Sequence, residues 1–306
     1  MKKTLIGLAV VLASGAAFAQ AGSGVSVYGV ADVGLTKSSA SADNDLHVSG
    51  NESGNNGNSR FGIKASEDLG GGLKASVNLE ANVNLKTGAT DTSLFQRAAN
   101  VTVGSEMGEL RIGRGLSLGH AAMASYDATG IANYSTVATT FGAIGGSRND
   151  SEIRLTSKEI HPGLKLAVGY VFEADNKAVG DVKESKVDLA AMYANGPISA
   201  SVVYSKPGKT EKSFALGGGY SFGQYKVMAS YQDPAGMSKG FTVGGSADFG
   251  AATVAVDVAR DTEAKATNLV VEGKYSLSKR TTTYAAYQRF GATSSNTVSA
   301  GLRHNF

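Results

Sequence analysis

Apolar and polar side chains alternate along much of the chain with a period of two. Between residues 296 and 306, Val298, Leu302 and Phe306 share one parity, while Ser299 and Arg303 share the other. The same alternation recurs in four further segments, at 164–173, 186–193, 213–222 and 241–249. This pattern predicts β-strands with one apolar face and one polar face. Helix-forming residues are nowhere spaced as an amphipathic helix of useful length would require.

The connectors between the predicted strands alternate in length. The tight ones lie at 68–72, 106–108, 161–163, 195–197, 222–224, 249–251 and 277–280, and the longer polar ones at 37–57, 86–93, 115–147, 174–184, 206–211, 233–239, 261–266 and 291–295. Aromatic residues gather at strand ends, namely Tyr170, Phe172, Tyr193, Tyr204, Tyr220, Phe222, Phe249, Tyr275 and Phe306. About sixteen strands, short turns at one end, long loops at the other and aromatic girdles are the plan of a transmembrane β-barrel.

The longest connector follows two predicted strands, 94–105 and 109–113, that flank a tight turn. From Gly115 to Ser147 the strand pattern stops, no helical period replaces it, and Asp127 is the only acid. The pattern returns at Asn149. A connector of about thirty residues without structure of its own is uncommon in a compact domain and indicates either a functional loop or disorder.

The first residues have the features of an export signal. Two lysines precede the apolar run Leu5–Leu12, and Ala17-Phe18-Ala19 forms a cleavage site before Gln20. A membrane anchor is the alternative, but the run is much shorter than the roughly 20 apolar residues of a spanning helix. Cleavage after Ala21 is also compatible with the sequence. We therefore expect a signal peptide at 1–19 and a single mature domain at 20–306.

Composition narrows the class of protein. The chain contains 40 glycines and no cysteine, so an exported form must be stabilised without disulfide bonds. Its formal charge is +3 and falls close to zero when the two signal-peptide lysines are removed, which argues against nucleic acid as a partner. After the signal, no apolar run approaches the length of a membrane-spanning helix.

A soluble β-sandwich or propeller would also contain short alternating strands. Its solvent face should be rich in Lys and Glu, whereas the polar face here is mostly Ser, Thr, Gly and Ala, and no blade repeat is present. The sequence therefore predicts an all-β fold, a sixteen-stranded antiparallel transmembrane barrel. Every backbone group must be paired inside a bilayer, which closes the sheet, and sixteen strands leave an aqueous lumen.

Four stretches of the chain resemble the general trimeric porins of Gram-negative outer membranes, in the branch typical of β-proteobacteria and Neisseria. They are Val-Ser-Val-Tyr-Gly-Val-Ala-Asp at 25–32, Asn-Ser-Arg-Phe-Gly-Ile-Lys at 58–64 with Glu-Asp-Leu-Gly-Gly-Gly-Leu-Lys-Ala at 67–75, Leu-Phe-Gln-Arg at 94–97 with Arg-Ile-Gly-Arg at 111–114, and Gly-Leu-Arg-His-Asn-Phe at 301–306. The turn at 67–75 and the terminal Phe306 together are the most specific of these.

The resemblance implies a homotrimer in the outer membrane, in contact with its lipid and lipopolysaccharide, that passes small hydrophilic solutes and ions by passive diffusion. It implies that the third long loop, which corresponds to Gly115–Ser147, folds inward and narrows the channel. It also implies that Phe306 is the signal read by the barrel assembly machinery. A channel specific for one solute class, and a plugged barrel that acts as an adhesin or structural protein, are the alternatives.

Family members place wall arginines opposite the inward loop, and Arg60, Arg97 and Arg148 match those positions. An outward-facing arginine near the bilayer midplane costs roughly 2–4 kcal/mol, so at membrane depth these side chains should face the lumen. With Arg114 they outnumber Asp127, which predicts a mild preference for anions. Ordinary wall or rim charges are the alternative interpretation. The chain departs from the family in its short length and its acid-poor loop.

The sequence gives little support for an enzyme active site or a cofactor site. Residues 206–210 contain Gly-Lys-Thr, but the phosphate-binding loop requires a glycine where Val203 stands. The four histidines lack the spacing of metal ligands, and no serine is singled out as a partner for His120. Asp43 and Asp45 could hold a cation or simply be solvated. We expect neither catalysis nor a cofactor.

Overall fold

The computed structural model describes residues 23–40, 45–172, 185–208, 211–236 and 238–306. The expected signal peptide with its cleavage site between Ala19 and Gln20, and Asp43 of the first long connector, lie outside these residues. Among the described residues, no helix combines the length and the apolar character needed to cross a membrane.

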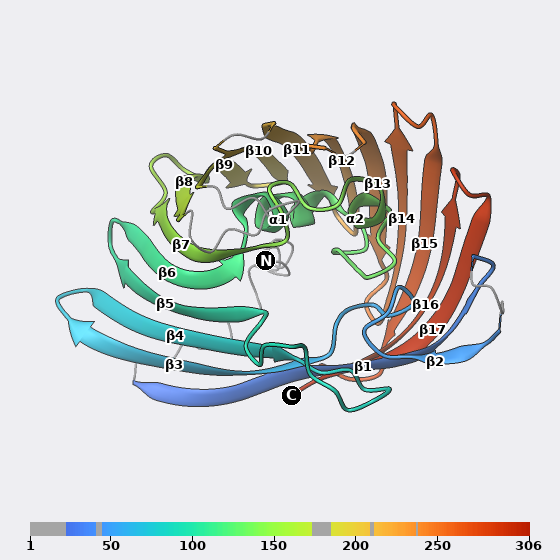
Figure 1. The fold of residues 1–306 in the computed structure, drawn as a ribbon, viewed down its shortest axis with the longest axis horizontal. Helices are drawn as coiled ribbons and strands as arrows, with labels where there is room; N and C mark the ends of the chain where they lie inside the picture. The colour runs from blue at the N-terminus through green and yellow to red at the C-terminus, as the bar shows by residue number, and fades with distance from the viewer. Residues whose placement is uncertain (1–22, 41–44, 173–184, 209–210, 237) are drawn as a thin grey trace.

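Sixteen antiparallel strands form a closed barrel, which Figure 1 shows as a ring. They are β1 (Gly24–Ser38), β3 (Arg60–Gly70), β4 (Leu73–Asn82), β5 (Ala98–Ser105), β6 (Gly108–Leu116), β7 (Arg148–Ser157), β8 (Leu164–Val171), β9 (Lys186–Asn195), β10 (Ile198–Pro207), β11 (Ser213–Phe222), β12 (Tyr225–Asp233), β13 (Gly240–Asp248), β14 (Ala252–Asp261), β15 (Thr267–Ser276), β16 (Thr281–Phe290) and β17 (Ser295–Asn305). A three-residue strand, β2 (His47–Ser49), pairs with β1 inside the first long connector. The predicted antiparallel barrel is confirmed.

The barrel closes at β1, the longest strand. Its first half pairs with β3, and its second half pairs with β17, so that Val30 lies opposite both Arg60 and Asn305. The last residue continues this pairing, because the N–H groups of Gly29 and Phe306 each donate to the carbonyl of the other, at 2.9 and 3.0 Å. No edge of the ring is therefore left open in the part of the chain that the structure describes, as a bilayer requires.

The two faces of the strands have the polarity of a membrane barrel. On β17, Val298 and Leu302 are 52% and 43% exposed, whereas Thr297 and Ser299 are only 3% exposed. The apolar parity thus faces outward and the polar parity inward, the reverse of a soluble sandwich. In an aqueous protein such an outer surface would be an extended apolar patch, whereas in a bilayer it meets lipid.

The tight and long connectors alternate as predicted, but the connector expected to lack structure contains helices. Residues 118–123 form α1 (Leu118–Met123), 124–126 a 3₁₀ turn and 136–141 α2 (Thr136–Phe141). Ser117 and Ser135 cap the two helices, each accepting an N–H at 3.1 Å. Helices of six residues are too short to show a 3.6-residue period, which is why the sequence did not reveal them.

Strand ends also differ from the expectation. β5 begins at Ala98 rather than at Leu94, so Arg97 lies just before the strand, and β6 continues to Leu116. A register shift between Gly113 and Gly115 disturbs the pairing of β6 with β7. This irregularity is a β-bulge, a feature that commonly redirects side chains at a functional site.

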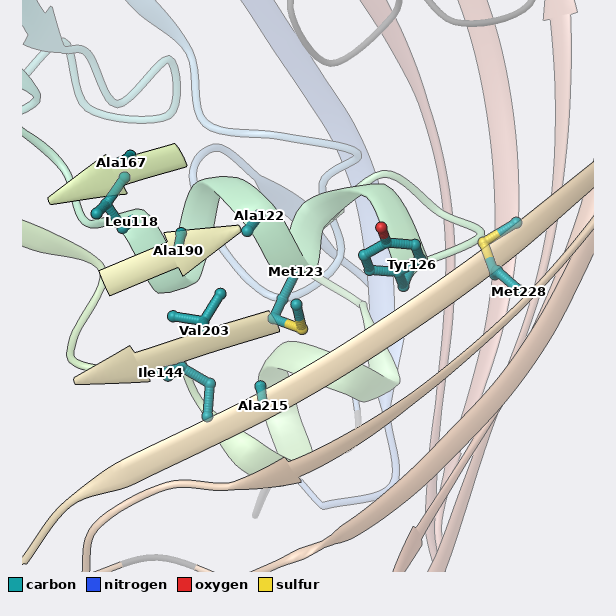
Figure 2. Close-up of a cluster of buried hydrophobic side chains, with 10 residues drawn as sticks. All are labelled: Leu118, Ala122, Met123, Tyr126, Ile144, Ala167, Ala190, Val203, Ala215 and Met228. Atoms are coloured by element: carbon teal, nitrogen blue, oxygen red, sulfur yellow. The ribbon is translucent and has the colours of Figure 1, made fainter. Parts of the chain in front are cut away.

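The helices of the long connector pack on the strand residues of inward parity. α1 contacts β9, β10 and β11, α2 contacts β14 and β15, and both lie within the ring in Figure 1. Figure 2 shows the apolar cluster that forms there, with Leu118, Ala122, Met123, Tyr126 and Ile144 from the connector, and Ala167, Ala190, Val203, Ala215 and Met228 from the strands. This cluster is the nearest counterpart of a hydrophobic core in the barrel.

Candidate functional site

The inner wall of the barrel is divided into a covered half and an open half. Inward-facing Ala190, Val203 and Ala215 are at most 6% exposed because residues 117–147 lie on them. By contrast, most inward residues of β4 and β5 are only partly buried, including Asn78 and Thr102. Any solvent path along the barrel axis must therefore run along the side formed by β3, β4 and β5.

Hydrogen bonds fix residues 117–147 to the wall at several points. The Tyr126 hydroxyl lies 2.9 Å from Ser201 Oγ, and the Ala128 N–H donates to Asp257 Oδ2 at 2.6 Å. The Tyr134 hydroxyl donates to Glu272 Oε2 at 2.5 Å. Because three different strands take part, the segment is held along its length rather than hinged at one end.

Close approach at Tyr126 depends on a glycine in the wall. A Cβ atom built at Gly217 of β11 would lie 2.1 Å from Tyr126 Cδ2, far inside van der Waals contact. Any other residue at position 217 would displace the ring. Gly217 thus allows the connector to lie directly on the sheet.

Asp127, the predicted acid of the constriction, is buried and engaged within its own connector. One carboxylate oxygen accepts from the Thr129 N–H and hydroxyl at 2.8 and 2.6 Å, and the other accepts from the Ser135 hydroxyl. None of these partners is one of the predicted arginines. The side chain organises the start of α2 rather than lining the open half.

Arg60 and Arg97 meet at a single carboxylate on the open half. Arg97 Nε lies 2.6 Å and Arg60 Nε 3.6 Å from Glu80, and the Tyr28 hydroxyl donates to the same carboxylate at 2.8 Å. Arg148 joins them by donating to the Arg97 carbonyl at 2.8 Å. The arginine cluster of Arg60, Arg97 and Arg148 therefore gathers three cations around the carboxylate of Glu80.

The sequence alone did not identify Glu80 as a site residue, although its inward parity could have been read there. It shares the inward parity of β4 with Asn78 and Asn82, and Asn82 pairs with Arg60. The register of β4 with β3 places Arg60 beside Glu80, and its register with β5 places Arg97 there. Register cannot be read from one strand alone.

Arg114 lies next to this cluster but is paired with a carboxylate. It has the strand parity of the exposed Leu110 and Ile112. Its guanidinium forms an ion pair with Asp150 and donates to the Gln96 carbonyl at 2.5 Å. Arg114 therefore adds no unpaired charge.

A second ionic network, also unforeseen, lies where the long connector rejoins the wall. Glu152 is fully buried and accepts from Arg111 and from Arg154, the latter at 2.8 Å. Next to it, Lys186 pairs with Asp188 at 3.4 Å and donates to the Gly145 carbonyl. The network fixes the end of the connector by charge-assisted hydrogen bonds.

His120, on α1, lies close enough to the arginine cluster to be affected by its charge. Burial, together with the charges of Arg148 and Arg97, lowers the pKa of His120 from 6.5 to about 4. The ring is therefore neutral at physiological pH, and it adds a further positive charge only in acid.

Comparison with known proteins places this geometry in context. The sequence model of a family described as "Gram-negative porin" matches residues 7–295. Outer membrane porin protein 32 of Delftia acidovorans is 33% identical over 228 residues, which cover 71% of this chain and 62% of that protein. An outer membrane porin protein of Bordetella pertussis is 30% identical over 258 residues, which cover 72% of this chain and 66% of that protein. The match thus spans less than two thirds of either relative.

A solved structure shares the fold over nearly the whole chain. An anion-selective porin from Comamonas acidovorans superimposes with a TM-score of 0.77 at 23% identity, and the match covers 93% of this chain and 100% of that one. An OmpT loop-deletion mutant from Vibrio cholerae gives a TM-score of 0.71 at 14% identity, with coverage of 93% and 99%. At these identities the likeness concerns the fold.

Replacing Tyr134 with Phe should loosen the long connector more than the same change at Tyr126. Tyr134 donates to a buried carboxylate, a bond that contributes about 1.5–3 kcal/mol, whereas Tyr126 bonds a neutral hydroxyl, which contributes about 0.5–1.5 kcal/mol. Hydrogen exchange of amides 128–141 should accelerate in both variants, and by roughly tenfold more in Tyr134→Phe. Equal acceleration would mean that the bond to Glu272 is not the stronger attachment.

Stability should decrease as the pH falls from 6.5 to about 4, in part because of His120. Between pH 6.5 and about 4, the unfolded chain binds a proton at this ring and the folded chain does not, so acid favours unfolding. Above pH 6.5 the ring is neutral in both states, and the folded protein loses no stability through His120. Thermal unfolding of wild type and His120→Asn across this window measures the effect. The unfolding temperature of the variant should change less with pH than that of wild type. Equal changes would rule out His120 as a source of the pH dependence.

Proposed function

The chain belongs to the Gram-negative porin family, and from this premise we propose that it forms a water-filled outer-membrane channel for passive diffusion of small hydrophilic solutes and ions, with a mild preference for anions. Members of this family are channels rather than enzymes. In the part of the chain that the structure describes, no group of three or more His, Cys, Asp or Glu could hold a metal ion.

The arginine cluster is the observation that carries the proposal. Arg60 and Arg97 keep 19% and 14% of their side-chain surface exposed on the open half, beside Glu80 at 15%. Three guanidinium groups around one carboxylate leave an excess of positive charge next to the solvent path. Charged side chains at a narrow point of a pore set its ion selectivity. The anion selectivity of the structural relative from Comamonas agrees with this sign.

Residues 117–147 act in this proposal as the inward loop that sets the width of the channel. The contacts with β9–β11, β14 and β15 support that role, since they hold the segment against the covered half of the wall. Asp127 is bonded within this loop, and Arg114 is paired with Asp150. In this proposal the arginine cluster, rather than Asp127 or Arg114, sets the selectivity.

We also propose, from the family, how the chain is exported and assembled. The chain is exported by a signal peptide at 1–19, folds as one domain, and assembles as a homotrimer. Phe306 acts as the recognition signal for the barrel assembly machinery, and its side chain is 52% exposed at the strand end where β1 and β17 meet.

Single-channel recording in a planar bilayer under a KCl gradient tests the function. Conductance steps in threes, with a reversal potential on the chloride side, are expected of an anion-preferring trimer. Saturable conductance with a binding constant would indicate a channel specific for one solute class. Insertion without conductance would indicate a plugged barrel that serves as an adhesin or a structural protein.

Replacing Arg97 with Glu should shift selectivity toward cations. The substitution changes the local charge by two beside the solvent path, which alters the energy of a passing ion by about 1 kcal/mol and the permeability ratio by roughly fivefold. The reversal potential under a KCl gradient is the measurement. Arg280→Glu makes the same charge change in the exposed turn between β15 and β16 and should have little effect. An unchanged potential in Arg97→Glu would remove Arg97 from the selectivity mechanism.

Deletion of Ala124–Ile144, bridged by a short glycine linker, should raise single-channel conductance. The deletion removes Tyr126, Tyr134 and α2 from the barrel, and the cross-section open to ions should increase roughly twofold if sixteen strands enclose a lumen. Retained insertion in threes would serve as the control for folding. Conductance equal to wild type would exclude the loop as the determinant of width.

A further inference from the structure

A second stretch of the chain, in the first long connector, also lies inside the barrel. Residues 50–59, which we call the strap, contain only Gly, Asn, Glu and Ser. They run between β2 and β3 on the inner side of the ring (Figure 1). Although the strap has no apolar side chain, Asn55, Asn56 and Ser59 are at most 8% exposed. Buried polar groups need hydrogen-bond partners to replace water, so the partners of the strap indicate its role.

Asp32 on β1 is the main partner of the strap in the wall. It shares the inward parity of Thr36, and its carboxylate accepts from the Asn55 amide at 3.1 Å and from the Gly57 N–H at 2.9 Å. The Tyr284 hydroxyl of β16 donates to the same carboxylate at 2.7 Å. Asp32 is 0% exposed as a result. The strap thus separates an inward carboxylate of the wall from the solvent path.

Glu272 on β15 is covered by the strap and the long connector together. The Asn56 amide donates to its carboxylate at 2.9 Å, beside the bond from Tyr134, and Arg303 donates to Asn56 Oδ1 at 2.8 Å. Glu272 is 0% exposed, whereas Lys274, its ion-pair partner at 2.6 Å, keeps 27% of its side-chain surface exposed. The lumen therefore meets the base of this ion pair rather than the acid.

The strap is held between the long connector and the arginine cluster. The Asn133 amide, at the far side of the long connector, donates to Asn58 Oδ1 at 2.7 Å and to the Glu52 carbonyl at 3.0 Å. Arg60 donates to the Asn58 carbonyl at 3.0 Å. Because Arg60 lies on the open half, the strap borders the solvent path where the arginine cluster stands.

Acids and bases of the inner wall differ in their access to solvent. Glu152 and Asp257 are 0% exposed, as Asp32 is, whereas Arg60 and Arg97 keep part of their surface open. Glu80 is partly open too, but the arginine cluster surrounds it. Coulomb energy falls with distance and is screened by salt, so an ion in the lumen interacts more strongly with an accessible base than with a covered acid.

We propose that the strap determines ion selectivity by covering the carboxylate of Asp32 and, with Tyr134, that of Glu272. The arginine cluster then acts on passing ions without opposition from these two acids. Asparagine suits this role, because its amide donates hydrogen bonds to a carboxylate without adding a charge of its own. The inference rests on the proposed function, since selectivity requires a conducting channel. The long connector sets the width, and the strap sets the balance of accessible charge.

Displacement of the strap from β1 tests the proposal. A Cβ atom at Gly54 would lie 1.6 Å from Thr36 Oγ1, so Gly54→Val should move the strap away from the wall and admit ions to Asp32. The chloride-to-potassium permeability ratio, measured from the reversal potential of single channels under a KCl gradient, should fall roughly two- to threefold. Gly273→Val is the matched control, because a Cβ atom there meets nothing within 4 Å, and it should leave the ratio unchanged.

Asp32→Asn distinguishes an uncovered acid from a general widening of the channel. Combined with Gly54→Val, it should restore the wild-type permeability ratio, because the uncovered side chain then carries no charge. A lowered ratio that Asp32→Asn does not restore would overturn the proposal, and so would an unchanged ratio in Gly54→Val when wild type conducts. A wild type that does not conduct would overturn the proposed function itself. If Gly54→Val does not insert, deletion of residues 51–57 with a glycine linker gives the same comparison.

Discussion

The barrel depends on the requirement that every backbone donor and acceptor inside a bilayer be paired. An unpaired group costs several kcal/mol in hydrocarbon, so the sheet must close on itself. β1 achieves this closure by pairing with β3 over one half of its length and with β17 over the other. Once the ring is closed, the alternation of each strand decides which side chains face lipid and which face inward.

Within the ring, the long connector covers one half of the inner wall and leaves the other half open. Its apolar side chains rest on small inward residues such as Ala190 and Ala215, while Tyr126 and Tyr134 bond to polar groups of the wall. The opposite side keeps its polar residues accessible, and there the arginine cluster surrounds Glu80. In the proposed channel, attachment and selectivity are thus carried by different strands, so that either can be altered without removing the other.

The sequence predicted the strands, the alternating connectors and the outward apolar face because these depend on a period of two and on turn residues. It also identified Arg60, Arg97 and Arg148, which the structure brings together. It could not identify Glu80 or the pairing of Arg114 with Asp150, since these depend on register and on a β-bulge. Nor could it show that Asp127 is used inside its own loop.

The apolar cluster had a faint signal in the sequence. One inward position on each of β9, β10 and β11 holds alanine or valine, at Ala190, Val203 and Ala215, where the open half has polar residues such as Asn78 and Thr102. Small apolar residues at one level of a polar parity, repeated over three neighbouring strands, indicate that something covers the wall at that level. The covering helices, only six residues long, left no periodic trace of their own.

The pairing of β1 with β17 also determines the order in which the molecule can fold. The two strands stand near opposite ends of the described chain, so the seam is the most non-local contact in the sheet, and such contacts form slowly. Until they form, a partial sheet has two bare edges able to recruit other chains. A nascent chain of this kind must be shielded from its neighbours until its last strand reaches its first.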